Sequence, residues 1–139
     1  MFSQKEQFAM TALSLQTPSH AGKATLAPRR PLSIAAIRKD LGISRERMAR
    51  LLDVSSRSIQ RWEENDQLPS NRWVVRVLND IGLIVELGYL VFTPEGFRLV
   101  MTTPQPGFNN RSGLEAIEAG QPNIVLGELA TLYEGAIGT

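Results

Sequence analysis

The sequence predicts an all-α protein. Two short segments near the middle of the chain each begin with a serine that can cap a helix, and a long apolar segment of helical period follows them. The last third of the chain carries clear start and stop signals for helices and gives little support for strands. With 139 residues, 42% of them hydrophobic, the chain is large enough for one compact domain or for two small ones that share a core.

Residues 1–30 are predicted to form a flexible N-terminal arm, since Gln16 to Arg30 is rich in Pro, Ser, Ala and Gly. The arm has neither the arginine-rich period of a transit peptide nor a secretory apolar run, so we expect a cytoplasmic protein. Pro31 to Leu41 is predicted to be a helix that Gly42 ends, with four residues available to pack against the next helices: Leu32, Ala35, Ile37 and Leu41.

The segment from Ser44 to Glu63 has the pattern of two helices that meet at a tight corner. Ser44 caps a helix that buries Met48, Ala49 and Leu52, and Ser55 caps one that buries Ile59 and part of Trp62. Asp53 takes the corner position, where glycine is usual because the backbone there tends to be left-handed. This spacing predicts a helix-turn-helix, and we place the domain at residues 31–72.

Ser55 to Glu64 is interpreted as the recognition helix. The predicted DNA contacts are hydroxyl, amide and guanidinium groups, which suit phosphates and base edges: Ser44, Arg45, Ser55, Ser56, Arg57, Gln60 and Arg61. A surface hairpin with solvated arginines is the alternative. DNA binding is favoured because several features of a helix-turn-helix occur together: the capping serines, the small Ala49, the corner at Asp53 and the inward-facing Ile59.

Residues 73–92 are predicted to be one linking helix. Its apolar residues lie on more than one face, so it needs more than one neighbour: Val74, Val77, Leu78, Ile81, Leu83, Ile84, Val85, Leu87 and Leu90. Arg76, Asp80 and Glu86 would be costly in hydrocarbon, which argues against a membrane span. As a hypothesis, this helix joins the two halves of the chain and contributes to a homodimer.

Residues 93–139 are predicted to be a small helical domain. Thr93-Pro94-Glu95 begins one helix, and Thr103-Pro-Gln-Pro-Gly107 stops it. After a loop, Ser112-Gly-Leu-Glu115 forms a capping-box pattern, and Gly120 ends that helix. Pro122 opens the last helix, which carries Val125, Leu126, Leu129 and Leu132 up to Gly135.

The composition argues against an enzyme. The chain has no cysteine and a single histidine, His20, so it can build neither a thiolate metal site nor a Cys/His dyad or Ser/His/Asp triad. No metal and no cofactor are expected. The carboxylates Glu63, Glu64 and Asp66 are interpreted as a solvated turn after the second helix rather than as an acid/base pair.

Charge divides the chain into two unlike halves, although the net charge is only +1. Residues 29–76 hold eleven basic and six acidic residues, whereas residues 77–139 hold two arginines and seven carboxylates. The basic half favours a polyanion, and the acidic half favours a different, basic partner.

In this order, the motifs from about Pro31 to Gly135 resemble the Xre/MbcA/ParS antitoxin family, which joins an Xre-like helix-turn-helix to a C-terminal toxin-binding domain. The C-terminal resemblance rests on Thr103-Pro104, Arg111-Ser112-Gly113-Leu114-Glu115, Gly120 and the helix from Val125 to Gly135. The chain departs from the family at Gly113 (usually proline), Met101 (often tryptophan) and Gln121 (usually acidic).

The resemblance implies a type II antitoxin that blocks a RES-domain, NAD-consuming toxin and represses its own operon. The toxin-binding residues expected on this basis are mostly at the chain's end: Arg111, Leu129, Leu132, Tyr133, Glu134 and Ile137. Core packing of the leucines explains their pattern equally well. Two other functions stay open, a stand-alone dimeric repressor without a toxin and an interaction adaptor with a vestigial DNA motif.

Overall fold

The computed structural model describes residues 32–137, and in this range the chain is helical. The described residues contain no β-strand, only an isolated antiparallel bridge between Gln105 and Arg111. The all-α expectation is therefore confirmed for this part of the chain. The predicted arm at residues 1–30, with His20, lies outside the described residues.

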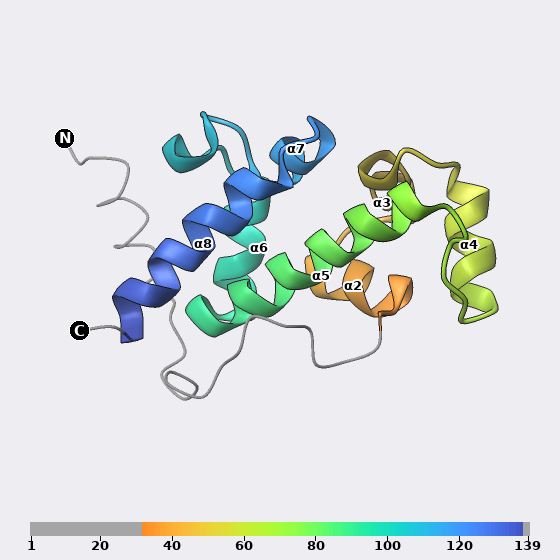
Figure 1. Cartoon of the computed structure of the whole chain (residues 1–139), viewed down its shortest axis with the longest axis horizontal. Coiled ribbons are helices and arrows are strands. Elements are labelled where there is room, and N and C mark those ends of the chain that lie inside the picture. The colour runs from red at the N-terminus through yellow and green to blue at the C-terminus, as the bar shows by residue number, and fades with distance from the viewer. Residues whose placement is uncertain (1–31, 138–139) are drawn as a thin grey trace.

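Three short helices form one end of the molecule (Figure 1): α2 (Ile34–Leu41), α3 (Arg45–Leu52) and α4 (Ser56–Glu64). The serines predicted as caps of α3 and α4 are confirmed, because Ser44 accepts from the Arg47 amide and Ser55 from the Ser58 amide. Gly42 ends α2 in the left-handed conformation, as expected.

The start of the first helix differs from the prediction. It begins at Ile34 rather than Pro31, because the Ser33 hydroxyl accepts from the Ala36 amide and caps it there. This register buries Ile34, Ile37 and Leu41 and leaves Ala35 exposed, so the expected packing role of Ala35 is wrong.

The corner between α3 and α4 is made at Asp53, which has φ 57° and ψ 50°. Its backbone amide is directed at the carbonyls of Ala49 and Arg50, so the end of α3 is closed in the way a glycine would close it. The residues predicted to face inward around this corner are buried, namely Met48, Ala49, Leu52, Ile59 and Trp62.

The long helix α5 (Arg72–Val91) begins at Asn71, whose side chain accepts from the amides of Trp73 and Val74. It runs from the three-helix end across to the C-terminal helices and packs on α2 and α3 as well as on α6 and α8 (Figure 1). The long helix therefore contacts elements of both halves of the chain. Within residues 32–137 no helix is both long and apolar enough to cross a membrane.

The C-terminal half consists of α6 (Pro94–Thr102), a 3-10 turn η1 (Pro106–Phe108), α7 (Gly113–Glu118) and α8 (Pro122–Ile137). Thr93 caps α6, with Pro94 in its first turn, as predicted. Ser112 and Glu115 form the predicted capping box at the start of α7. The last helix, α8, continues two residues beyond the expected end at Gly135.

Two glycines allow close approaches in this half. A Cβ on Gly88 of α5 would clash with the Phe97 ring, so the glycine lets α6 pack tightly against α5. A Cβ on Gly113 would clash with Met101 Sδ. Gly113 and Met101 are two of the positions at which the chain departs from the antitoxin family, and they touch each other. The methionine side chain occupies space that a larger residue at position 113 would need.

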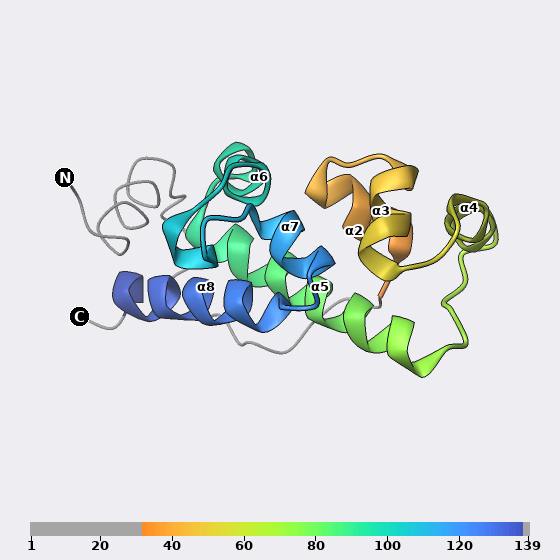
Figure 2. The same cartoon turned by 90° about the horizontal axis from the view of Figure 1, so that it is seen from above.

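One hydrophobic cluster extends through the whole described structure. It includes Met48 and Ile59 from the three-helix end, Leu78 and Ile84 from α5, and Leu129 from α8. The two halves, although opposite in charge, therefore share a core. Seen from above, α4 lies at one end of the molecule and the C-terminal end of α8 at the other (Figure 2).

Candidate nucleic-acid interface and second binding surface

The outer face of α4 is polar and accessible. Ile59 is completely buried and Trp62 nearly so, which anchors the helix and turns the other side outward. The residues predicted to contact DNA from this helix are all exposed: Ser55, Ser56, Arg57, Gln60 and Arg61. The helix thus presents donors of the kind that read base edges and phosphates.

Arg57 and Arg61 make no ion pair within the described residues. The Arg61 guanidinium lies 5.9 Å from the centre of the Trp62 ring, and Gln60 Nε2 donates to Glu64 Oε2 at 2.9 Å. Neither contact buries the side chains. Had the two arginines been held in internal ion pairs facing the protein, α4 would not have been a plausible DNA-reading helix.

Arg45, at the start of α3, is different from the α4 residues. Its Nε donates to Glu63 Oε1 at 2.9 Å, although the side chain remains 40% exposed. Ser44 is exposed, with its hydroxyl engaged in capping α3. Both residues lie next to the outer face of the helix-turn-helix, but Arg45 is held in place by an internal acid.

Glu63 corrects the prediction of a solvated turn. It lies within α4 rather than after it, and its side chain is only 5% exposed. Arg38 donates to both of its oxygens, from Nε at 2.6 Å and from Nη2 at 3.1 Å, and a further Arg38 nitrogen donates to the Ile43 carbonyl at 3.0 Å. One carboxylate thus links α2, α3 and α4.

Hydrogen bonds from Arg38, and then from Arg45, hold the pKa of Glu63 below its usual value. The same hydrogen bond with Glu63 raises the pKa of Arg38. Glu63 and Arg38 are therefore both charged at neutral pH. No sequence signal pointed to this pairing, because Arg38 and Glu63 are 25 positions apart and only the fold brings them together.

A second ion pair joins the basic end to the acidic half. Glu118, at the end of α7, lies 2.7 Å from Arg47 Nε and 3.8 Å from Arg50 Nε, both on α3. The opposite charges predicted to separate two functions therefore also meet at the junction of the halves.

The residues predicted to bind a toxin fall into three groups. Leu129 is fully buried and Tyr133 is 7% exposed, so both belong to the core and neither offers a free surface. Leu132 is half-buried and Glu134 is exposed. Ile137 ends α8, and its side chain lies outside the described residues.

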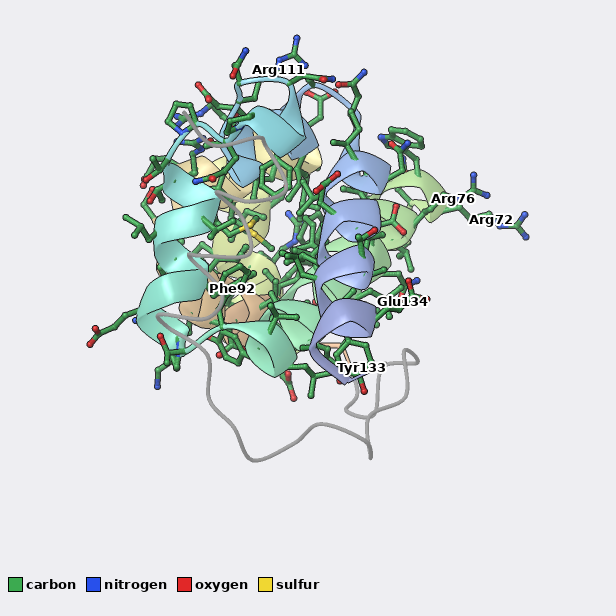
Figure 3. The ribbon with its side chains drawn as sticks, turned by 90° about the vertical axis from the view of Figure 1, so that its left-hand side faces the viewer. Arg72, Arg76, Phe92, Arg111, Tyr133 and Glu134 are labelled. Carbon is green, nitrogen blue, oxygen red and sulfur yellow. The ribbon has the colours of Figure 1, made fainter. Side chains whose placement is uncertain are left out.

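Arg111 is exposed but lies apart from this group. It donates to Gln121, just before α8, whereas Glu134 is near the far end of that helix (Figure 3). Thirteen residues at 1.5 Å per residue separate these two ends by about 20 Å. The expected toxin-binding residues therefore do not form a single patch.

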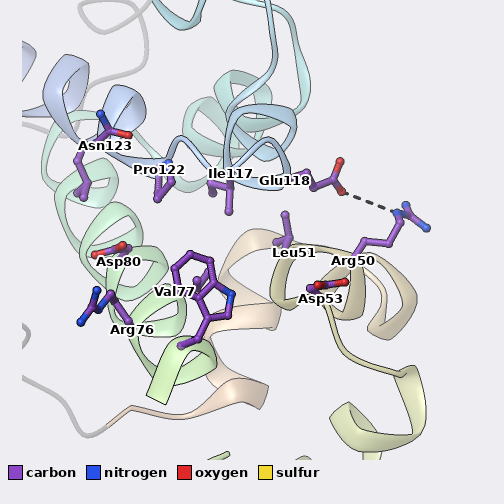
Figure 4. Close-up of a pocket in the computed structure, with 13 residues that line it drawn as sticks. Arg50, Leu51, Asp53, Arg76, Val77, Asp80, Ile117, Glu118, Pro122 and Asn123 are labelled. Carbon is purple, nitrogen blue, oxygen red and sulfur yellow. Dashed lines mark ion pairs between the residues drawn. The ribbon is translucent and has the colours of Figure 1, made fainter. Parts of the chain in front are cut away.

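A groove of about 570 Å³ lies where α3, α5, α7 and the start of α8 meet (Figure 4). Sequence reasoning did not anticipate it. Its lining combines apolar and charged side chains: Arg50, Leu51, Asp53, Trp73, Arg76, Val77, Asp80, Ile117, Glu118, Gly120, Pro122, Asn123 and Leu126. Among residues 32–137 no group of His, Cys, Asp or Glu side chains is arranged to hold a metal ion.

Residues 34–81 match the helix-turn-helix family. This part of the chain is a helix-turn-helix domain. The match continues past residue 72 into α5, so the first part of the long helix belongs to the helix-turn-helix domain as well as to the link.

The whole fold also has a solved counterpart. A chain in the crystal structure of the M. tuberculosis MbcT-MbcA toxin-antitoxin complex is similar, with a TM-score of 0.61 and 20% sequence identity. The similarity covers 73% of the present chain and 91% of that chain. No curated protein sequence matches the chain. The fold expected from the family resemblance, a helix-turn-helix domain followed by further helices, is thereby confirmed.

Proposed function

We propose that this protein is an antitoxin that binds and neutralises a RES-domain, NAD-degrading toxin and represses its own operon as a homodimer. The proposal rests on Arg57 and Arg61, which are exposed on α4 and make no ion pair with residues 32–137, in a fold that is also found in a toxin-antitoxin complex. The helix-turn-helix domain would read the operator, and the acidic half would hold the toxin.

The position of the two surfaces supports this division of labour. The recognition helix α4 and the C-terminal end of α8 lie at opposite ends of the molecule (Figure 1). A toxin bound at the end of α8 would leave α4 open to DNA, so one chain can hold both partners. Burial of Leu129 and Tyr133 narrows the proposed toxin contact to Leu132, Glu134 and the residues after them.

DNA reading is tested by titrating the DNA upstream of the gene with Arg57→Ala and Gln60→Ala variants. Each lost bidentate base contact should weaken operator binding by about 1–3 kcal/mol and relax base preference, while neutralisation is kept. Arg98→Ala is the matched control, because Arg98 is an exposed arginine on α6 and belongs to neither α3 nor α4. Unchanged operator affinity in both α4 variants would show that α4 does not read bases.

Toxin binding is tested by co-expressing the chain with the product of the neighbouring gene and measuring cellular NAD. Deleting residues 134–139 should impair protection before it impairs operator binding, because Tyr133 and the core residues before it are kept. A truncated chain that still protects cells would contradict this location of the toxin contact. A neighbour that is not toxic would instead support a stand-alone repressor.

A further inference from the structure

The groove between α3, α5, α7 and α8 takes part in neither of the proposed contacts. Its floor includes Val77 of α5, Ile117 of α7 and Leu126 of α8, and its rim is charged (Figure 4). It lies beside the helix-turn-helix domain but does not include the outer face of α4. An apolar floor with a charged rim is the usual composition of a protein-protein contact.

Trp73 is the most exposed large hydrophobic side chain of the described residues, at 59% exposure, and it lines this groove. It stands in the first turn of α5, ahead of the stripe that Val74 and Leu78 bury in the core. Most of the apolar surface of α5 is already covered within one chain, so its N-terminal end is the part left for a partner. Tryptophan is one of the residue types enriched at interface hot spots, which lie in well-packed pockets.

The rim carries both signs of charge. Arg76 and Asp80 are one turn apart on α5, and Arg50 lies near Glu118 on the opposite wall. Asp80 is half-buried and lies near the positive charge of Arg76 on the same helix. Asp53, Asp80 and Glu118 place carboxylates along the groove, which makes it less suited to a polyanion such as DNA than the outer face of α4.

We propose that this groove is the surface on which a second copy of the chain docks. A two-fold interface needs a patch that complements itself, and this one offers an exposed tryptophan beside an apolar floor, with the neighbouring opposite charges of Arg76 and Asp80 on one helix. Trp73 of each copy would enter the groove of the other, and Arg76 of each would face Asp80 of the other. The inference deepens the proposed homodimer by naming its surface. It also places the contact next to the helix-turn-helix domain, as paired reading of a symmetric operator requires.

The oligomeric state of the full chain, without DNA or toxin, is the direct test. In equilibrium sedimentation at micromolar concentration we expect a dimer for the natural sequence. Trp73→Glu should raise the dimer dissociation constant by about 30-fold, which corresponds to the roughly 2 kcal/mol of an interface hot spot. Leu99→Glu is the matched control, because Leu99 is 52% exposed on α6 outside the groove, and it should leave the dimer intact.

A charge exchange tests the predicted pairing independently of folding. Arg76→Asp alone and Asp80→Arg alone should each weaken the dimer, because each sets like charges against each other across the two-fold axis. The double variant should restore it. Far-UV circular dichroism checks that all variants remain folded, which we expect since Trp73 and Arg76 are exposed and Asp80 is only half-buried.

A monomeric natural chain, or a Trp73→Glu variant that dimerises like the control, would overturn the proposal. So would a variant that stays dimeric but loses operator binding, since Trp73 would then belong to the DNA contact. These outcomes are distinct from failure of the proposed function, which is judged by protection of NAD in cells and needs no measurement of dimerisation.

Discussion

Single side chains in the helix-turn-helix domain divide between those that hold the fold together and those that face solvent. Glu63 is buried and receives hydrogen bonds from Arg38 and Arg45, whereas Arg57 and Arg61 on the same helix are exposed and make no ion pair within residues 32–137. A buried carboxylate requires such partners, because an unpaired charge removed from water is costly. The exposed arginines have no such constraint and can exchange water for phosphate.

Replacing Glu63 by glutamine should lower stability and change its dependence on pH. Because the folded protein holds the pKa of Glu63 below its ordinary value of 4.5, its stabilisation is complete above pH 4.5. That stabilisation is lost as the pH falls through the lowered pKa. We expect Glu63→Gln to cost about 2 kcal/mol at neutral pH, from the weakened charged hydrogen bonds.

The measurement is urea unfolding at a series of pH values. In the acid range, the stability of the natural chain should fall towards that of the variant. If the difference in unfolding free energy between the natural chain and the variant stayed constant from neutral pH into the acid range, Glu63 would not titrate as the structure indicates.

At the scale of elements, the corner between α3 and α4 depends on one left-handed residue. Asp53 has a positive φ, which asparagine, aspartate and glycine tolerate better than residues with longer or branched side chains. This conformation lets the Asp53 amide close the end of α3. It also sets the angle at which α4 leaves α3. A residue unsuited to this conformation would strain the corner.

Asp53→Ala should therefore destabilise the protein by about 1 kcal/mol, whereas Asp53→Gly should not. For a chain of this size that difference is a loss of about 4 °C in the melting temperature. The measurement is the melting temperature of each variant, with thermal unfolding monitored by circular dichroism. Equal melting temperatures for the alanine and glycine variants would mean that backbone strain at the corner is not limiting.

For the whole molecule, the shared core decides how the two halves behave. The hydrophobic cluster runs from α2 to α8 through α5, and the contact of Glu118 with Arg47 and Arg50 closes the junction. That ion pair is partly exposed, so it contributes at most about 1 kcal/mol. The continuous apolar packing is the larger stabilising term, because it buries many side chains rather than one pair.

We therefore expect the described part of the chain to unfold in one step. Tryptophan fluorescence reports on Trp62 and Trp73, at the helix-turn-helix end, while circular dichroism reports on all helices. The two transitions should coincide in urea. Glu118→Gln should move both together by about 1 kcal/mol or less. Separate midpoints would show that the halves fold as independent units.

Features governed by neighbours in the chain could be predicted from the sequence. The caps at Ser44, Ser55, Thr93 and Ser112 were all predicted, because a capping hydroxyl accepts from an amide only two or three residues away. The corner at Asp53 and the outward face of α4 follow from the same short-range periodicity. Local pattern alone therefore predicts the two helices with their tight corner, the exposed face of α4 and most helix boundaries.

Only the tertiary structure decided which residues meet across the chain. It placed Glu63 between two arginines, removed Leu129 and Tyr133 from the candidate toxin surface, and formed the groove around Trp73. Periodicity shows that a side chain lies on an apolar or polar face, but not which element covers that face. Burial and ion pairing depend on contacts between distant segments, and the packing of α5 against both halves sets these contacts.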